Sequence, residues 1–301
     1  MKNVKPSFYE DFSCIASRCQ HSCCVGWEID IDEDTAALYA SVSGELGAEL
    51  KRAVSDDPQP HFLLNKDQSC PFLRRDKLCR LYLELGENSL CDICALHPRF
   101  INSFPGREEV GLGLCCEEVV RLLLTSSTKP FLIEEDDGMN DAADPWVEQL
   151  AALRFELFEL LLDFYIPFSA RLDRFTQRTG ADLPSFHGEK WQAFFLSLER
   201  MDESWSTVLN LLDHVSEQNV IDTMQSERYA RILCYLLYRH FINAKTPTEA
   251  RAILRFCLIG TMLIAALDAA DPAQRDEHLR AFSAEIEYSD ENVEKICWNF
   301  P

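Results

Sequence analysis

The stretch CIASRCQHSCC, residues 14–24, begins the region that decides the fold of this chain. Six more cysteines follow before residue 117, in the spacings Cys70-x8-Cys79 and Cys91-x2-Cys94 and in an adjacent pair at 115–116. Ten of the 13 cysteines therefore lie between residues 14 and 116. Thiolates gathered at this density are typical of proteins that bind a metal ion or an iron-sulfur cluster.

The spacing of these cysteines suits metal binding. Cys91 and Cys94 stand three places apart, which on a helix or tight turn puts both sulfurs on one side of a single ion. Cys19 and Cys23 stand four places apart and can do the same. The adjacent pair at 23–24 differs, because neighbouring side chains diverge on a regular backbone.

Three interpretations of the cysteines are open. A 4Fe-4S cluster needs four thiolates. A structural zinc ion takes thiolates with or without His21 and His97, and buried reduced cysteines can act as small hydrophobes. The last interpretation does not account for so many cysteines in one stretch. Spacing does not separate iron from zinc, although the excess of thiolates over histidines favours an iron-sulfur cluster.

Composition limits the kind of partner. The 301 residues include 50 acidic and 29 basic ones, which gives a net charge of −21. A surface this acidic repels nucleic acid and favours a cationic partner, such as a protein that presents lysines. Acidity also serves solubility alone. The sequence does not indicate an oligomeric state.

Hydropathy bears on where the protein acts. The first residues contain no apolar run typical of a secretory signal. The longest uncharged apolar run, 256–267, is too short to cross a bilayer, so we expect no membrane insertion. We therefore expect a cytoplasmic protein, in which thiols stay reduced and disulfides do not form.

The overall pattern predicts a mainly α protein with two domains. A cysteine-rich metal- or cluster-binding module with short strands and helices covers residues 1–130, and a helical bundle covers 145–301. The boundary is placed in the acidic, turn-rich residues 125–145. Apolar residues recur at helical spacing in five C-terminal segments, which are 146–164, 191–215, 229–242, 248–267 and 272–286.

Local patterns predict elements near the cysteines. Apolar and acidic residues alternate over 27–32, as in a short half-buried strand or extended segment. A helix over 35–50 begins after a capping Asp32 or Asp34. Residues 77–86 have the pattern of a helical turn or short helix that ends at glycine 86.

The cysteines stand within longer motifs. These are YEDFSC (9–14), the Cys19-x3-Cys23-Cys24-x-Gly-Trp run, IDID (29–32), CPFL (70–73), LCRLY (78–82), LGE (85–87), LCDIC (90–94), HPRF (97–100), CEEVVRLLL (116–124) and SDENVEKI (289–296). In these motifs the chain resembles the flagellin lysine-N-methylase (FliB) family, densely over 8–124 and sparsely beyond. A looser similarity is to the YkgJ-type cysteine-cluster proteins, which share the split Cys-Cys, Cys-Pro and Cys-x-x-Tyr pattern.

The resemblance implies a function. It implies a protein-lysine N-methyltransferase that transfers methyl groups from S-adenosylmethionine to lysines of flagellin in the cytoplasm. It also implies an iron-sulfur cluster in the N-terminal module. Cys115 falls where the family pattern has no cysteine and is left out. Carried over by position, the metal ligands are Cys14, Cys19, Cys23, Cys24, Cys70, Cys79, Cys91, Cys94 and Cys116.

Candidate catalytic groups follow from the chemistry of amine methylation. A lysine amine must lose its proton, and a nearby carboxylate commonly orients it. Glu28, Asp30 and Asp32 adjoin the cysteine loop and are the candidate catalytic acids. Trp27 is a candidate cofactor-binding residue that would stack on a cofactor or cover the amine. The alternative is that Trp27 belongs to the core, and that the acids are surface residues and a helix cap.

A site for the methyl donor is less evident. Arg99 is a candidate to bind a carboxylate, such as that of the donor, or cluster sulfides; the alternative is a structural salt bridge. The segment GLGL at 111–114 is only half of a Gly-rich nucleotide loop. A second class of function is a non-enzymatic iron-sulfur or zinc protein, for electron transfer, cluster handling or interaction. A thiol redox enzyme using Cys91 and Cys94 lacks the expected βαβ context.

Overall fold

The computed structural model describes residues 1–126, 131–136, 138 and 142–301, and the chain divides into two compact units. Ser13–Phe100 forms one, the cysteine unit. Met1–Phe12 and Ile101–Pro301 together form the other, the helical unit. This division differs from the predicted boundary at 125–145, part of which (127–130, 137 and 139–141) lies outside the described residues.

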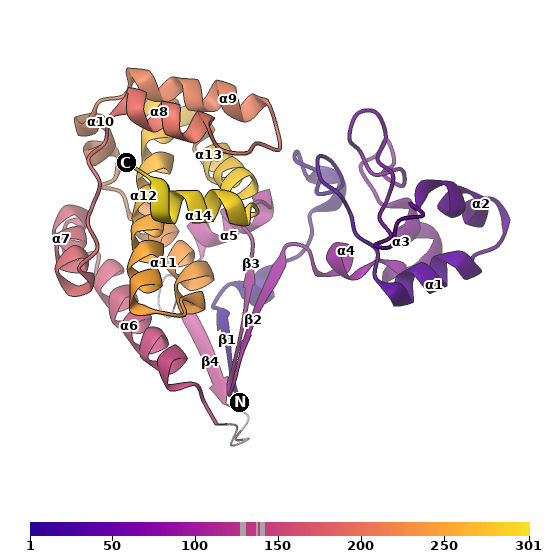
Figure 1. Ribbon diagram of the computed structural model, residues 1–301, viewed down its shortest axis with the longest axis horizontal. Coiled ribbons are helices and arrows are strands. Elements are labelled where there is room, and N and C mark those ends of the chain that lie inside the picture. The colour runs from indigo at the N-terminus through magenta and orange to yellow at the C-terminus, as the bar shows by residue number, and fades with distance from the viewer. Residues whose placement is uncertain (127–130, 137, 139–141) are drawn as a thin grey trace. The chain divides into compact units, whose positions relative to one another are not determined.

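A four-stranded sheet explains the division (Figure 1). The strands stand in the order β2-β3-β1-β4, so the first strand of the chain is an inner strand. β1 pairs in parallel with β3, with Lys2 opposite Arg107, and antiparallel with β4, with Lys5 opposite Ile133. In the order of the sequence, the cysteine unit is thus inserted between β1 and the strands that pair with it, β3 and β4. The strands are β1 Lys2–Pro6, β2 Arg99–Phe104, β3 Arg107–Leu112 and β4 Leu132–Asp136.

Helices pack on the sheet through buried polar contacts. Arg154 donates hydrogen bonds of 2.6 and 2.8 Å to the carboxylate of Glu109 on β3, and both side chains are fully buried. Arg107 donates to the same carboxylate at 2.6 Å. The hydroxyl of Tyr238 donates to the backbone oxygens of Val4 and Val110. These contacts join the sheet to α6 (Pro145–Leu161) and α11 (Glu227–His240).

The helical unit is built around one long helix, α12 (Pro247–Ala270). Every residue from Phe256 to Asp268 is buried, so the apolar run seen in the sequence is the centre of the core. α12 is long and apolar enough to span a membrane, and 83% of its most apolar window is buried inside the protein, as in a core helix. The other helices are α5 Glu117–Thr125, α7 Phe168–Thr179, α8 Gly188–Leu196, α9 Ser204–Leu209, α10 Glu217–Thr223, α13 Arg275–Phe282 and α14 Asp290–Asn299.

The predicted C-terminal helices are largely confirmed, with differences in extent. The segment predicted over 191–215 is wrong as one helix, because α8 ends at Leu196 and α9 begins at Ser204. The predicted segment 272–286 includes a π-helical turn at Ser283–Glu287 after α13. α7, α10 and α14 lay outside the five predicted segments. The mainly α fold class is confirmed, with the sheet as an addition.

The cysteine unit has short helices: α1 Glu33–Ser41, α2 Gly44–Ala53, α3 Arg80–Leu85 and α4 Asp92–Leu96. The single helix predicted over 35–50 is wrong, because the chain turns at Val42–Ser43 and resumes at Gly44 with φ +79°. The start after Asp32 is confirmed by its side chain, which accepts a hydrogen bond from Thr35 N. The end of α3 at Gly86, with φ +87°, is also confirmed.

Candidate functional site: the thiol cluster of the cysteine unit

Five thiols from four parts of the cysteine unit lie close enough to perturb one another. They are Cys24, Cys70, Cys79, Cys91 and Cys94, which we call the thiol cluster. Cys70 and Cys91 are buried, and the other three pack against the same core. All 13 cysteines are free of disulfides. Segments that are far apart in the sequence therefore fold to bring these sulfurs together.

Backbone hydrogen bonds hold the segments in place. Cys70 N donates to Cys24 O at 2.7 Å, and Gly26 N donates to Gln68 O at 3.0 Å. A β-bridge between Leu73 and Cys79 closes the next loop. In α4, Cys94 N donates to Cys91 O at 2.9 Å, which places the Cys-x2-Cys pair on one helical turn, as its spacing predicts.

Negative charges on the thiolates of the thiol cluster would repel one another. Burial, together with the neighbouring thiols Cys24, Cys79 and Cys91, raises the pKa of Cys70 to about 12. A hydrogen bond between Cys91 and Cys94 lowers the pKa of Cys91 and raises that of Cys94, so this pair retains one proton. Without a cation the buried cluster therefore does not ionise fully. A bound metal would supply the missing positive charge.

The chemistry of these donors fits an iron-sulfur cluster or zinc, because both take thiolates. In the described residues, no group of three or more His, Cys, Asp or Glu side chains is placed to hold a metal ion, so the thiols do not form a complete set of metal ligands. The thiol cluster thus brings suitable ligand types near one another without placing three of them around one point.

Other predicted ligands of the cysteine unit lie in the loop before the thiol cluster. Cys14 and Cys23 are exposed. Cys19 is partly exposed, and its thiol donates to His21 O at 3.0 Å. Cys23 interacts with the neighbouring thiol of Cys24, which lowers the pKa of Cys24 to about 7. This loop therefore adjoins the cluster through residues 23–24.

Cys116 belongs to the helical unit, unlike the other eight predicted ligands. It is the N-cap residue of α5, and its neighbour Cys115 interacts with Tyr288 through a side-chain hydrogen bond. The likeness to the family pattern thus covers cysteines of both units.

The candidate catalytic acids occupy different environments. Glu28 is exposed, and its carboxylate lies 3.8 Å from the imidazole of His61. Asp30 is exposed and bridges to His61 through its backbone. Asp32 accepts hydrogen bonds from Thr35 N and Asp92 N, each at 2.9 Å, so one carboxylate caps α1 and contacts the start of α4.

Asp32 is held as an anion by these bonds. Its partial burial favours the neutral form, but the N–H groups of Asp92 and Thr35 outweigh burial and lower its pKa. A carboxylate with both oxygens engaged and a lowered pKa is a weak proton acceptor. The geometry therefore assigns Asp32 a structural task, as the helix-cap alternative in the sequence had it.

The two candidate cofactor-binding residues, Trp27 and Arg99, are both partly buried. Trp27 is partly buried against the core, and its indole N–H donates to Cys23 O at 2.7 Å. Its ring centroid lies 6.1 Å from that of His97. Burial lowers the pKa of His97 to about 4, so its imidazole is neutral at physiological pH. Arg99 is half-buried at the first position of β2.

Sequence reasoning missed a polar network in the helical unit. The guanidinium of Arg239 lies 4.5 Å from the ring centroid of Tyr288 and 3.6 Å from the carboxylate of Glu287. Glu287 also pairs with His240 at 2.8 Å, and Tyr288 contacts Cys115. The predicted helix over 229–242 contains Arg239 and His240, but helical spacing does not indicate which polar side chains meet.

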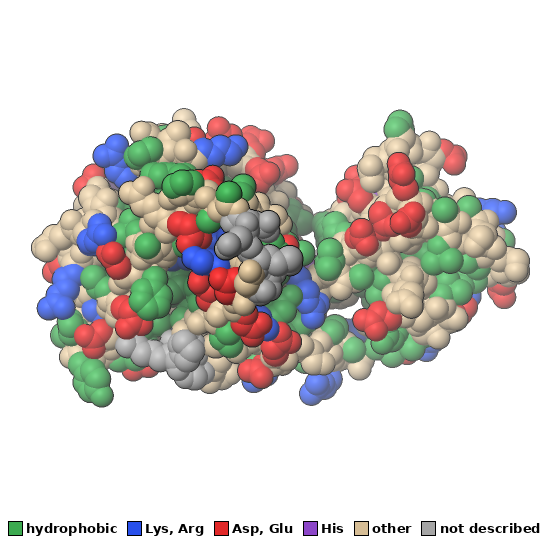
Figure 2. All heavy atoms as spheres, turned by 90° about the horizontal axis from the view of Figure 1, so that it is seen from below, with side chains coloured by type: hydrophobic (Ala, Val, Ile, Leu, Met, Phe, Trp, Pro, Cys, Tyr) green, Lys and Arg blue, Asp and Glu red, His purple; other side chains and the backbone are tan. Residues whose placement is uncertain are grey.

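The acidic composition is visible on the molecular surface. Figure 2 shows Asp and Glu side chains on the viewed face of each unit, interspersed with fewer Lys and Arg. Such a surface is consistent with the expected preference for cationic partners.

Comparison with known proteins gives similarity to lysine-N-methylases and to a flagellar biosynthetic protein. The chain is 29% identical over 146 residues to a lysine-N-methylase of Salmonella choleraesuis (strain SC-B67), and 28% identical over 146 residues to that of Salmonella typhimurium (strain LT2). Each match covers 44% of this chain and 35% of the relative, so the matched part of the chain spans about a third of these methylases.

A third relative is matched over most of its own length. It is the flagellar biosynthetic protein FliU of Salmonella muenchen, 30% identical over 134 residues, which are 40% of this chain and 76% of that protein. No family model and no solved structure matches the chain. With these relatives, the chain belongs to the flagellin lysine-N-methylase (FliB) family.

Proposed function

We propose that this protein is a protein-lysine N-methyltransferase that acts on flagellin in the cytoplasm, with S-adenosylmethionine as methyl donor and an iron-sulfur cluster in the cysteine unit. The observation that carries the proposal is membership of a family whose relatives are named lysine-N-methylase and FliU. The thiol cluster and the acidic surface support it, because they suit a metal cofactor and a lysine-bearing substrate.

The reaction sets three demands on the protein. The attacking amine nitrogen must be unprotonated, it must be aligned with the methyl group, and water must be excluded. The nitrogen forms a bond to the methyl carbon while the bond from that carbon to the donor sulfur breaks, and the amine proton passes to a base or to water. Glu28 remains a candidate base, since its carboxylate is exposed and not hydrogen-bonded to a helix end as that of Asp32 is.

The thiols of the cysteine unit would hold the iron-sulfur cluster. Cys24, Cys70, Cys79, Cys91 and Cys94 offer more ligands than the four that a cubane cluster takes. A bound cluster would neutralise the thiolates and fix the loops that carry them. Trp27, which packs against the same core, and Arg99 are the residues proposed to contact the donor. Zinc is the alternative metal, because it accepts the same ligands.

The test is methyl transfer by the purified protein. The protein is isolated without oxygen, its iron, zinc and sulfide are measured, and it is incubated with isotopically labelled S-adenosylmethionine and flagellin. We expect label in flagellin lysines, located by mass spectrometry. A metal-loaded, folded protein that leaves flagellin unlabelled would refute the proposal.

A second candidate function is a non-enzymatic metal-cluster protein for electron transfer, cluster handling or interaction. The observation that favours it is the thiol cluster itself, since metal binding needs only the cysteine unit. Broad visible absorption of the isolated protein together with sulfide would indicate an iron-sulfur cluster, and a colourless protein with stoichiometric zinc would indicate zinc. Metal content without methyl transfer would favour this second function.

A further inference from the structure

His61 of the cysteine unit lies between two carboxylates. Its imidazole Nε2 is 3.8 Å from a carboxylate oxygen of Glu28 and 3.9 Å from one of Asp57. Both acids are well exposed, at 67% each, whereas the side chain of His61 is 18% exposed. None of the three is among the predicted metal ligands, so this group is available for a task of its own.

Two extended segments of the chain bring His61 and Glu28 together. Phe62 N donates a hydrogen bond to Ile29 O at 3.0 Å, and an antiparallel bridge pairs Asp30 with His61. Phe62 and Ile29 are buried in the core of the unit. Because side chains alternate along an extended backbone, the residues next to them (Glu28, Asp30 and His61) lie on the opposite, outer face.

Hydrogen bonds to the other ring nitrogen fix the tautomer of His61. Its Nδ1 lies 3.2 Å from the backbone oxygen of Gln59 and 3.1 Å from the hydroxyl oxygen of Ser55. A carbonyl oxygen only accepts, so Nδ1 carries the hydrogen and donates it to Gln59. The neutral imidazole therefore has its lone pair at Nε2, the atom that faces Glu28 and Asp57.

Three acceptors thus face one another, which are the Nε2 lone pair of His61 and the carboxylates of Glu28 and Asp57. Two acceptors 3.8 Å apart can both lie at about 2.9 Å from one donor nitrogen placed between them. An ammonium group suits this position, because it is positive and has three N–H donors. A metal ion suits it less, since within the described part of the chain no three such side chains are placed around one.

We propose that His61 is the general base of methyl transfer, and that its Nε2 takes the proton from the substrate lysine. Glu28 and Asp57 hold the lysine ammonium before this step and stabilise the imidazolium after it. The inference rests on the proposed function, which supplies the lysine and the methyl donor. It deepens that function by assigning the base, and it gives Glu28 the task of orienting the amine.

The proton and the methyl group move in separate steps. The lysine ammonium gives one proton to Nε2 of His61, which leaves a neutral amine and an imidazolium beside two carboxylates. The amine nitrogen then forms a bond to the methyl carbon of S-adenosylmethionine while the bond from this carbon to the donor sulfur breaks. The products are a methylated lysine ammonium and the neutral thioether of the donor. The imidazolium afterwards releases its proton to water.

Two variants separate proton transfer from a structural task of His61. His61→Asn has an amide nitrogen near the position of Nδ1, which can still donate to Gln59 O, but it has no atom at the position of Nε2. His61→Gln has an amide near the position of Nε2, and an amide does not take up a proton at neutral pH. We expect each variant to lower kcat for flagellin methylation about 100-fold or more, with little change in KM. Full kcat in His61→Asn would limit His61 to its turn and overturn the proposal.

The matched control is His214→Asn in the helical unit. His214 is 84% exposed and also lies beside a carboxylate, at 3.3 Å from Asp213. This variant should keep the full kcat. A loss of kcat equal to that of His61→Asn would show a general effect of removing a histidine and would overturn the assignment.

The pH dependence of kcat gives a second measurement. In the unaltered protein kcat should rise with pH and level off once His61 is deprotonated, with Glu28, Asp57 and Asp30 as the charged groups around it. In His61→Asn, kcat should keep rising with pH, because the amine must then lose its proton to solvent. The same rise and plateau in both proteins would place the base elsewhere.

The tautomer of His61 is tested without any methyl transfer. In protein labelled with ¹⁵N in its histidines, NMR should show hydrogen on Nδ1 and none on Nε2 in the neutral ring of His61. Hydrogen on Nε2 would leave no lone pair for the lysine proton and would overturn the proposal.

Failure of this inference differs from failure of the proposed function. If the unaltered, folded and metal-loaded protein leaves flagellin unlabelled, the proposed function is refuted and the assignment of the base falls with it. If the unaltered protein labels flagellin and His61→Asn does so with the same kcat, the methylase stands and only the base assignment is refuted.

Discussion

The two units of the chain bury apolar surface in different ways. The helical unit closes around α12, where every residue from 256 to 268 is buried, and around a sheet crossed by a buried ion-pair network. The cysteine unit has helices of five to ten residues, and its core includes Cys70 and Cys91 with three further thiols against it. Helices this short are marginal alone. The contrast teaches that the larger unit is held by packing, whereas the proposed metal would add to the stability of the smaller one.

The largest expected effect breaks the cysteine unit alone. Cys91→Ser or Cys23→Ser should remove the metal and, with it, the protection of residues 13–100 against hydrogen exchange, because metal binding and folding of such a unit are coupled. Metal and sulfide content, with exchange measured by mass spectrometry, checks both effects.

The matched control for these changes is Cys234→Ala, a buried cysteine of α11 in the helical unit. It should retain the full metal content. Full metal content in Cys91→Ser would instead show that the thiol cluster is not the binding site.

The next largest effect is expected in the helical unit, when a buried carboxylate is removed from its ion-pair network. Glu109→Ala leaves Arg154 and Arg107 buried without their shared carboxylate. We expect a loss of about 3–5 kcal/mol in the free energy of unfolding, measured by urea denaturation. Metal content should be unchanged.

An exposed ion pair provides the control for this prediction. Glu156→Ala removes a 2.6 Å contact with Arg178 in which both side chains are about half exposed. It should cost under about 1 kcal/mol. Equal losses for Glu109→Ala and Glu156→Ala would mean that the buried network does not stabilise the helical unit.

A smaller effect tests whether polar caps also stabilise the cysteine unit. Asp32→Ala removes the acceptor of Thr35 N and of Asp92 N, and should destabilise this unit by about 1–2 kcal/mol. Asp32→Asn retains one acceptor oxygen, so the stability of its cysteine unit should lie between that of the unaltered protein and that of Asp32→Ala. Faster hydrogen exchange in α1 and α4 is the measurement, and unaltered exchange in both helices would contradict the role of Asp32.

The smallest effect concerns pH and the helical unit. Burial lowers the pKa of His240, although its partner Glu287 opposes this. The unfolded chain therefore binds a proton near pH 6.5 that the folded protein takes up only at lower pH. Stability contributed by the neutral His240 is present above about pH 6.5 and is lost as the pH falls below that value. Urea denaturation should show a shallower pH dependence for His240→Gln, and parallel curves would contradict the prediction.

Local features of the fold could be predicted from the sequence, since each is specified by neighbouring residues. Asp32 before a helical pattern gave the start of α1, Gly86 gave the end of α3, and the apolar run 256–267 gave the centre of α12. The turn at Val42–Ser43 was missed because Leu and Val continue the helical spacing across it. Gly47 shows how tight this turn is, because a Cβ added at Gly47 would lie 2.0 Å from the backbone oxygen of Val42.

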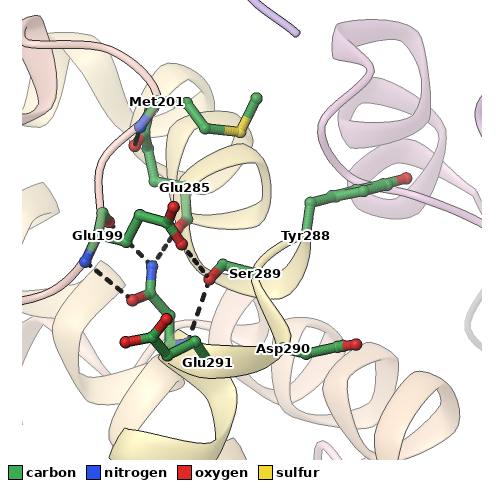
Figure 3. Close-up of a pocket in the computed structure, with 8 residues that line it drawn as sticks. Glu199, Met201, Glu285, Tyr288, Ser289, Asp290 and Glu291 are labelled. Carbon is green, nitrogen blue, oxygen red and sulfur yellow. Dashed lines mark hydrogen bonds between the residues drawn. The ribbon is translucent and has the colours of Figure 1, made fainter. Parts of the chain in front are cut away.

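Long-range features could not be predicted in the same way. β1 pairs with strands that begin more than a hundred residues later, and no local pattern marks that pairing. Cysteine spacing predicted ligands in general but not which of them meet, because the thiol cluster forms from four separate segments. A pocket in the helical unit also joins distant segments, because it is lined by Glu199, Met201, Glu285 and residues 288–292 (Figure 3).

The insertion of the cysteine unit between β1 and its partners has a consequence for synthesis on the ribosome. β1 is made first, yet β3 ends at residue 112 and β4 at residue 136. At roughly 5–20 residues per second, β1 stays without partners for on the order of 5–25 seconds. The cysteine unit is complete in that interval, before the sheet can close. If the cysteine unit binds the proposed metal on the nascent chain, that binding would thus precede the pairing of β1.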